Sequence, residues 1–367
     1  MESMANSKKR SASIDLFRII SMLMVVFLHL LGHGGVLANL APKSANFFVL
    51  GGLESLCIIA VNCFALTTGF LYVGKKIKLK NILNLYLQVL SFSLIIAVFF
   101  FLTGKQQFET KTFLKYLFPI SSGRYWYFSA YFILFFMMPL LNVILEYLSK
   151  KFLYLVLIIS IFLFGIYTFA SSAIFGDTFK LFNGYSFIWL AVLYLFGGAI
   201  KKYEIYSKFN SKRWLLFYLI SAILSFIIGL ITSISSNFKQ LPFIEDYTFI
   251  FNILSSCLLL IFFANLQIKP NKIITFFAKH SFGVYLFHEH PFIRQAIIKD
   301  RLIFIANYNP LLAILTILGI ALLVYLLGTL IEFIRKLIFK LIKLDKLTEK
   351  IDNKIVNLYN KNNKEQK

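Results

Sequence analysis

Charged residues are scarce in this sequence. Only 15% of its 367 residues are Asp, Glu, Lys or Arg, whereas 59% are hydrophobic and the mean hydropathy is +0.77. A soluble chain of this length typically carries about 25% charged residues. The shortage of charge therefore excludes an ordinary soluble fold and indicates a protein embedded in the lipid bilayer.

Cysteine is also rare, and its pattern excludes two kinds of site. Cys57, Cys63 and Cys257 are odd in number, lack CxxC spacing and fall within apolar runs. They support neither a disulfide framework nor a zinc site, and we expect no metal. The first apolar run follows basic residues but lacks a cleavage site of small residues after it, so we expect it to be retained as a span.

Long apolar runs are what the sequence has in abundance, and a helix needs about 20 apolar residues to cross a bilayer. We therefore expect an all-α, polytopic membrane helix bundle of about ten transmembrane helices with cytoplasmic N- and C-termini. The predicted spans are 14–36, 51–73, 82–103, 126–145, 152–170, 184–200, 214–234, 247–267, 282–300 and 311–334.

The net charge of +22 follows this predicted topology. Of the 38 Lys and Arg residues, 27 fall on the side predicted to be cytoplasmic and nine on the other, while Arg18 and Arg294 lie within spans. Cytoplasmic loops of membrane proteins carry such an excess of basic residues. We therefore attribute the positive charge to the orientation of the chain in the membrane, and we expect no nucleic-acid partner.

Residues 1–334 are predicted to form one transmembrane domain, and 335–367 a basic cytoplasmic tail. Leu and Ile recur at helical spacing between the lysines of the tail, as in an amphipathic helix on an anionic leaflet. A frayed, solvated end is the alternative. The segment 104–125 is expected to re-enter the membrane or lie on its surface.

The stretch "SIDLFRIISMLMVVFLHLLGHGG" (13–35) carries four titratable residues within an apolar run. Polar groups inside a span are costly and usually face protein or a cavity. Arg18 and His29 are eleven residues apart, which on an α-helix returns within about 20° of the same direction after roughly 16 Å. Asp15 and His33 extend this face by one turn at either end, and the slender Met22 and Val25 between leave room for a ligand chain.

A helix with these groups suits a reaction between an anionic donor and a hydroxyl acceptor. Histidine near neutral pH takes a proton from an attacking hydroxyl, and arginine binds phosphates. The structural alternatives are an interfacial Asp15–Arg18 pair with a snorkelling arginine, and a buried His29 satisfied by a neighbouring helix.

These residues resemble the opening of the acyltransferase 3 family of integral-membrane acyltransferases, in which an Asp-x-x-Arg element is followed by a His eleven residues after the Arg. Three further segments are similar to family motifs, in order along the chain: "VNCFALTTGFL" (61–71), "RYWYFSAYFILFFMMPLLN" (124–142) and "SFGVYLFHEHP" (281–291). Thr68 stands where Ser is usual and Asn62 where many relatives have Asp. The sequence looks closest to the short, single-domain branch of the family.

The resemblance implies an acyltransferase domain in which His29 is catalytic with Arg18 as its partner, and Asp15 belongs to the same element. It places Tyr285 and His288 near the site and Trp126 in its wall. Lys75 or Lys76 would match a basic residue of the family, and Lys76 is our candidate donor contact. For the oxyanion, Tyr285, His288 and Arg294 are candidate donors, and Glu289 and His290 form either part of the site or a local pair with Arg294.

We therefore expect a membrane-bound O-acyltransferase that moves an acyl group, acetyl above all, from acyl-CoA to a hydroxyl of a cell-surface glycan or lipid-linked glycan precursor. Acetyl-CoA is the expected donor, the plasma membrane the expected location, and a homo-oligomer is possible. A transporter or flippase of a glycan or anion is the alternative function, and a non-catalytic membrane sensor or assembly component is a third.

Overall fold

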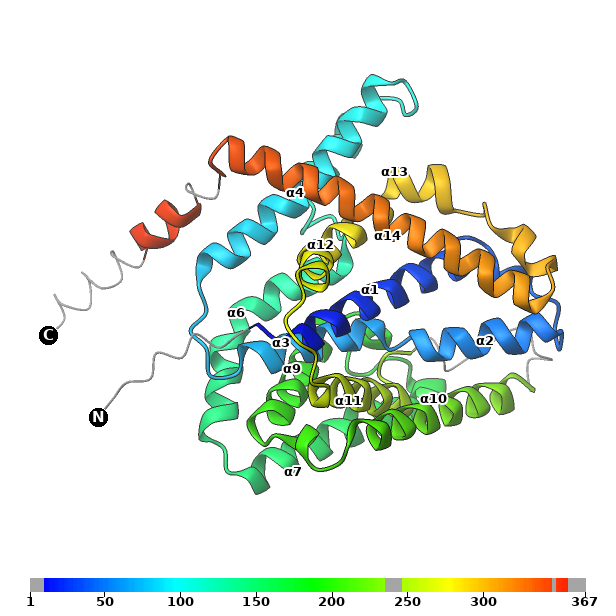
Figure 1. The fold of residues 1–367 in the computed structure, drawn as a ribbon, viewed down its shortest axis with the longest axis vertical. Helices are drawn as coiled ribbons and strands as arrows, with labels where there is room; N and C mark the ends of the chain where they lie inside the picture. The colour runs from blue at the N-terminus through cyan, green and yellow to red at the C-terminus, as the bar shows by residue number, and fades with distance from the viewer. Residues whose placement is uncertain (1–9, 235–245, 345–347, 356–367) are drawn as a thin grey trace, which may run out of the picture.

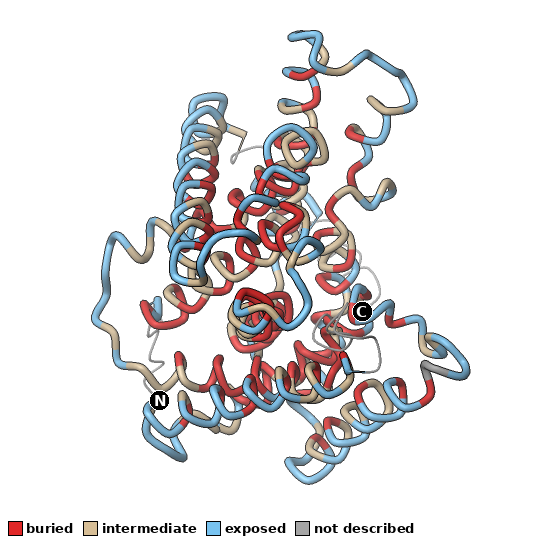
Figure 2. Tube along the Cα trace, turned by 90° about the vertical axis from the view of Figure 1, so that its right-hand side faces the viewer, coloured by how far each residue is buried: buried red, intermediate tan, exposed pale blue. Residues whose placement is uncertain are grey.

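The computed structural model describes residues 10–234, 246–344 and 348–355. Every regular element in these ranges is helical, which confirms the predicted all-α fold (Figure 1). The longer helices cross one another in a bundle, and buried residues gather at its centre while exposed turns lie outside (Figure 2). Residues 1–9 and 356–367, including Lys8, Lys9 and the end of the predicted tail helix, lie outside the described residues.

The α-helices have the following bounds: α1 Ala12–Gly32, α2 Ala45–Cys57, α3 Ala60–Tyr72, α4 Leu79–Leu102, α5 Thr110–Leu117, α6 Trp126–Tyr147, α7 Lys150–Ile161, α8 Thr168–Phe175, α9 Phe187–Lys202, α10 Ser211–Ser233, α11 Ile250–Asn265, α12 Lys272–His288, α13 Pro291–Ile293 and α14 Pro310–Leu341. Shorter 3₁₀ and π turns are η1 Leu37–Asn39, η2 Phe162–Tyr167, η3 Phe182–Gly184, η4 Ile205–Ser207, η6 Arg294–Ile298 and η7 Ile303–Asn307.

Seven helical segments in the described part of the chain are long and apolar enough to cross a membrane: 12–39, 45–72, 79–102, 126–147, 150–171, 211–233 and 310–341. Two further predicted spans, 184–200 and 247–267, coincide with shorter helices, α9 and α11, of 16 residues each. The chain is thus a multi-pass helical protein. The total of ten spans and the side of the termini stay predictions.

The predicted span 282–300 is wrong as one continuous helix. α12 begins ten residues earlier, at Lys272, and ends at His288, and the chain then continues through α13 and the π turn η6. Pro291 is the reason, since proline lacks an N–H and drives the residue before it out of the helical conformation. His290 accordingly has an extended ψ of 126°.

Polar side chains fix where several helices begin, by accepting a hydrogen bond from the otherwise unpaired N–H groups of the first turn. Ser11 caps α1, Ser186 caps α9 and Asn271 caps α12. Asn309 caps α14, where Pro310 takes the first helical position. These caps set the register of the helices that carry the candidate site.

α1 is the central helix of the bundle, and α2, α3, α11, α12 and α14 contact it (Figure 1). Its apolar residues Phe17, Val26 and Leu31 are fully buried. Among its polar residues, Asp15 and Ser21 are buried, whereas Arg18 and His29 are half-buried.

α3 and α9 pack backbone against backbone at two glycines. A Cβ on Gly69 would lie 2.0 Å from the carbonyl oxygen of Tyr194, and a Cβ on Gly197 would lie 2.0 Å from that of Leu66. Small residues permit such close helix packing in membranes. The two glycines thus hold α3, one wall of the site, against the rest of the bundle.

Two segments outside the long helices, 104–125 and 348–355, each contact the bundle. Within 104–125, α5 places Tyr116 in a stack on His290, with ring centroids 5.0 Å apart. α14 continues past residue 334 to Leu341. Residues 348–355 are helical, and Thr348 Oγ1 donates to Asn84 Oδ1 of α4 at 2.8 Å.

Candidate active site

The candidate site is built where α1 meets the end of α12. His29 and His33 lie one turn apart at the end of α1, and the N–H of His33 donates to the carbonyl oxygen of His29 at 2.9 Å. α12 ends opposite them with His288, and Glu289 follows as its C-cap. Residues about 260 positions apart in the sequence are thereby brought within hydrogen-bond distance.

His288 determines which nitrogen of His29 carries a proton. Nδ1 of His288 lies 2.6 Å from the carbonyl oxygen of Val284, which only accepts, so this nitrogen is the donor. In the neutral ring Nε2 of His288 then accepts, and it lies 2.9 Å from Nδ1 of His29. His29 therefore donates through Nδ1, and its Nε2 keeps a lone pair able to take a proton.

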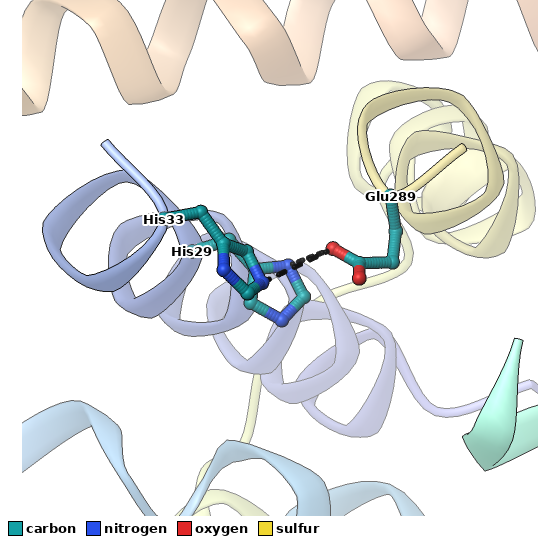
Figure 3. Close-up of side chains that lie close together, drawn as sticks. All are labelled: His29, His33 and Glu289. Atoms are coloured by element: carbon teal, nitrogen blue, oxygen red, sulfur yellow. Dashed lines mark ion pairs between the residues drawn. The ribbon is translucent and has the colours of Figure 1, made fainter. Parts of the chain in front are cut away.

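Glu289 supplies the negative charge beside the two α1 histidines. One carboxylate oxygen, Oε2, lies 3.1 Å from Nδ1 of His29 and 3.8 Å from Nε2 of His33 (Figure 3). This contact is electrostatic, since Oε2 of Glu289 forms no hydrogen bond. The other oxygen, Oε1, pairs with the guanidinium of Arg294. With only 8% of its surface exposed, Glu289 is a buried carboxylate balanced by its neighbours.

A cavity of about 410 Å³ opens beside this cluster. His29, His33, Glu289 and Arg294 line it, together with Tyr285. An aromatic wall completes it, in which the ring of Tyr185 lies 4.4 Å from that of Trp126 and 5.0 Å from that of Tyr247. Met22 and Val25 line the same cavity, as predicted for the narrow residues of the α1 face.

A second cavity, of about 250 Å³, contains Arg18. It is lined by polar residues of α3, α6 and α12, among them Thr68, Tyr131 and Ser281. The two cavities share three lining residues, Phe64, Tyr127 and Phe282. The cavities that contain Arg18 and His29 are thus neighbours, with these aromatic side chains between them.

Three predicted site residues, His288, Asp15 and Lys76, line neither cavity, although His288 contacts His29 directly. The buried carboxylate of Asp15 lies 3.7 Å from Nη1 of Arg18 and also pairs with Arg10, so it contacts the arginine and not His29. Lys76 is exposed in the turn before α4 and lines neither cavity. Nζ of the adjacent Lys75 lies 6.0 Å from the ring centre of Tyr72, which lines the Arg18 cavity.

The sequence alone identifies no carboxylate partner for His29, and the structure supplies Glu289. Its signal in the sequence was its position directly after His288, in "FHEHP". His33 also reaches the cavity, although it was singled out only for its place on the α1 face. Phe64, Tyr127 and Phe282 lie within the three later segments that resemble family motifs, but nothing in the sequence singles them out as lining residues.

His29, His33 and Glu289 are also the one group of described residues whose ligand atoms lie close enough, within 4.8 Å, to hold a metal ion. Two neighbours favour acid–base chemistry instead. Nδ1 of His29 is hydrogen-bonded to His288, and the Arg294 guanidinium beside Glu289 repels a cation. The expected absence of a metal stays a prediction.

The comparison with known families decides the assignment. A family model described as an acyltransferase domain, that of the acyltransferase 3 family, matches residues 11–331. The chain belongs to this family. No curated protein and no solved structure matches it. The membership confirms the resemblance and makes the chain a multi-pass membrane protein with an acyltransferase domain.

The four segments that resemble family motifs all reach the two cavities. Segment 61–71 supplies Phe64 and Thr68 from α3, 124–142 supplies Trp126 and Tyr127 from α6, and 281–291 supplies Phe282 and Tyr285 from α12, opposite α1. Segments far apart in the chain thus converge on one pair of cavities.

Proposed function

We propose that this acyltransferase is an acyl-CoA-dependent O-acyltransferase of the plasma membrane, which moves an acetyl group to a hydroxyl of a cell-surface glycan or lipid-linked glycan precursor. The observation that supports it best is the state of His29. Its Nδ1 is hydrogen-bonded to His288, so its Nε2 keeps a lone pair. The cavity that His29 lines adjoins the cavity that contains Arg18.

Arg18 is the proposed anchor for the phosphates of the donor. A guanidinium binds phosphate oxygens in pairs, and Asp15 beside it holds the side chain in place. A ligand anchored there would extend its thioester arm past Phe64, Tyr127 and Phe282 toward His29. The basic residues near 75–80 would attract the anion, with Lys76 as a peripheral contact.

His29 is the proposed general base. Its Nε2 takes the proton of the acceptor hydroxyl as the hydroxyl oxygen attacks the thioester carbonyl carbon. The C–S bond then breaks, and the CoA sulfur leaves and takes the proton back from His29, so that the ester and free CoA are formed. Glu289 stabilises the transient imidazolium, and Arg294 or Tyr285 stabilises the oxyanion.

The aromatic wall supports a sugar-like acceptor. Trp126, Tyr185 and Tyr247 present closely spaced rings to the cavity of His29. Aromatic faces combine a large apolar surface with polar edges, which suits the mixed surface of a sugar ring. Family membership favours this enzyme over the transporter that the sequence alone left open.

The test measures the donor half of the reaction, since it requires no known acceptor. We would purify the protein in detergent and measure acetyl-CoA binding and slow acetyl-CoA hydrolysis for wild type, Arg18→Ala and His29→Gln. Binding is expected to weaken at least tenfold with Arg18→Ala. His29→Gln keeps a hydrogen-bond donor but cannot act as the base, so hydrolysis is expected to be lost while binding persists.

Arg213→Ala is the matched control, because Arg213 is an exposed arginine at the start of α10 that lines neither cavity. It should bind and hydrolyse acetyl-CoA as the wild type does. Failure of folded wild-type protein to bind acetyl-CoA would overturn the proposed donor. Full hydrolysis by His29→Gln would overturn the proposed base.

A further inference from the structure

A groove of about 690 Å³ lies between the first part of α12 and the last part of α14, outside both cavities of the candidate active site. Its lining is rich in lysine: Lys272, Lys279, Lys336 and Lys340. Asn271 and His280 are the other nitrogen-bearing side chains that line it. No residue that lines the groove lines either cavity of the candidate active site.

The positive charge of this groove is largely uncompensated. Lys336 is held by Glu332, with its Nζ 3.4 Å from Oε1, and it donates to the carbonyl oxygen of Lys279 at 2.6 Å. Glu332 also binds Arg335 through both oxygens, at 2.7 and 2.8 Å. Among the described residues, Lys272, Lys279 and Lys340 form no ion pair, and no carboxylate lines the groove.

Exposed apolar side chains line and flank the groove. The side chains of Phe276 and Leu337 are partly exposed, and α14 presents further exposed apolar residues along its outer face, among them Leu330, Ile334 and Ile338. On a helix that crosses a membrane, this face meets acyl chains. An anionic head between lysines beside such a face is the chemistry of an acidic phospholipid, which basic pockets between transmembrane helices bind.

We propose that the α12–α14 groove is a binding site for an anionic phospholipid, with the phosphate held by Lys272, Lys279 and Lys340 and the acyl chains along α14. A phosphate-bearing nucleotide has the same charge. The lipid is favoured because the groove is flanked by exposed apolar surface, and because α12 separates it from the Arg18 cavity, which Ser281 and Phe282 line.

The test compares lipid retention by native mass spectrometry of the full chain in detergent. Equal amounts of phosphatidylglycerol and phosphatidylcholine with matched acyl chains would be added to wild type and to Lys272→Gln/Lys279→Gln/Lys340→Gln. Wild type is expected to retain phosphatidylglycerol at least fivefold better than phosphatidylcholine. The triple variant should lose this preference.

Two further variants control for charge and folding. Lys151→Gln/Lys208→Gln/Lys212→Gln removes the same charge from exposed lysines outside the groove and should retain the preference. Lys272→Arg/Lys279→Arg/Lys340→Arg keeps the charge and should also retain the preference. Loss of the preference in this variant, if it folds, would contradict binding through positive charge at these positions. Three outcomes would each overturn the lipid assignment. Wild type could retain both lipids equally, the control triple could lose the preference, or coenzyme A could displace phosphatidylglycerol.

Discussion

Nδ1 of His29, on the central helix α1, lies 2.9 Å from Nε2 of His288 at the end of α12. The carbonyl oxygen of Val284 fixes the proton of His288 on its Nδ1, so one backbone group sets the tautomer of two rings. This chain of hydrogen bonds orients His29 and leaves a lone pair on its Nε2. In many enzymes a third group orients the general base in the same way, and here His288 orients His29.

Removing the acceptor on His288 should therefore slow catalysis without preventing donor binding. His288→Phe keeps an aromatic ring in a fully buried position but cannot accept the His29 proton. We expect the turnover number to fall by about 100-fold, within the range for general-base catalysis, with the affinity for acetyl-CoA changed less than threefold. Steady-state kinetics and a binding isotherm would measure both, and equal loss of the two would contradict a positioning role.

Neutralising Glu289 tests the electrostatic part of the site. Glu289→Gln keeps the size of the side chain but removes the charge that faces His29, His33 and Arg294. We expect turnover to fall by at least tenfold, because the imidazolium formed during transfer loses its counter-charge. Glu146→Gln, at an exposed position on α6, is the control and should keep wild-type turnover.

Arg18→Lys separates the geometry of the donor anchor from its charge. Lysine keeps the positive charge and loses the planar pair of donors that suits phosphate. We expect KM for acetyl-CoA to rise about tenfold with kcat nearly unchanged, since uniform binding is lost and the chemistry is not. A fall in kcat at constant KM would instead place Arg18 in the chemical step.

The α3–α9 contact should be sensitive to a single methyl group. Gly69→Ala places its Cβ 2.0 Å from a backbone oxygen of α9, so the helices must move apart. We expect a destabilisation of about 1–3 kcal/mol, measured as a lower Tm in detergent. Gly319→Ala is the control, because nothing lies within 4 Å of its Cβ, and an unchanged or slightly higher Tm is expected.

The predicted orientation in the membrane can be tested at the two ends of α4. Its 24 residues span about 36 Å, so Lys76 before it and Lys111 after it should lie on opposite sides. A membrane-impermeant maleimide on intact cells is expected to label Lys111→Cys, and to label Lys76→Cys only after permeabilisation. The wild-type chain, with its three native cysteines, gives the background, and the reverse pattern would refute the predicted topology.

Local chemistry determined much of this protein. The long apolar runs predicted helices, because a membrane leaves the backbone few other ways to pair its polar groups. The shared face of Arg18 and His29 was readable from an eleven-residue spacing, since helix geometry is periodic along one segment. Pro291 favours an end of α12 before it. The apolar run around this proline nevertheless predicted one continuous span, 282–300, which is wrong.

Only the tertiary structure decided what those residues meet. Glu289 and His288 reach His29 from about 260 positions away, and no spacing within one helix predicts that distance. Phe64, Tyr127 and Phe282 come from three helices, and their place between two cavities exists only once α3, α6 and α12 pack around α1. The sequence thus specified the helices and the polar face of α1. The packing of helices distant in sequence determined that Glu289 and His288 contact this face and which aromatic residues line the cavity beside it.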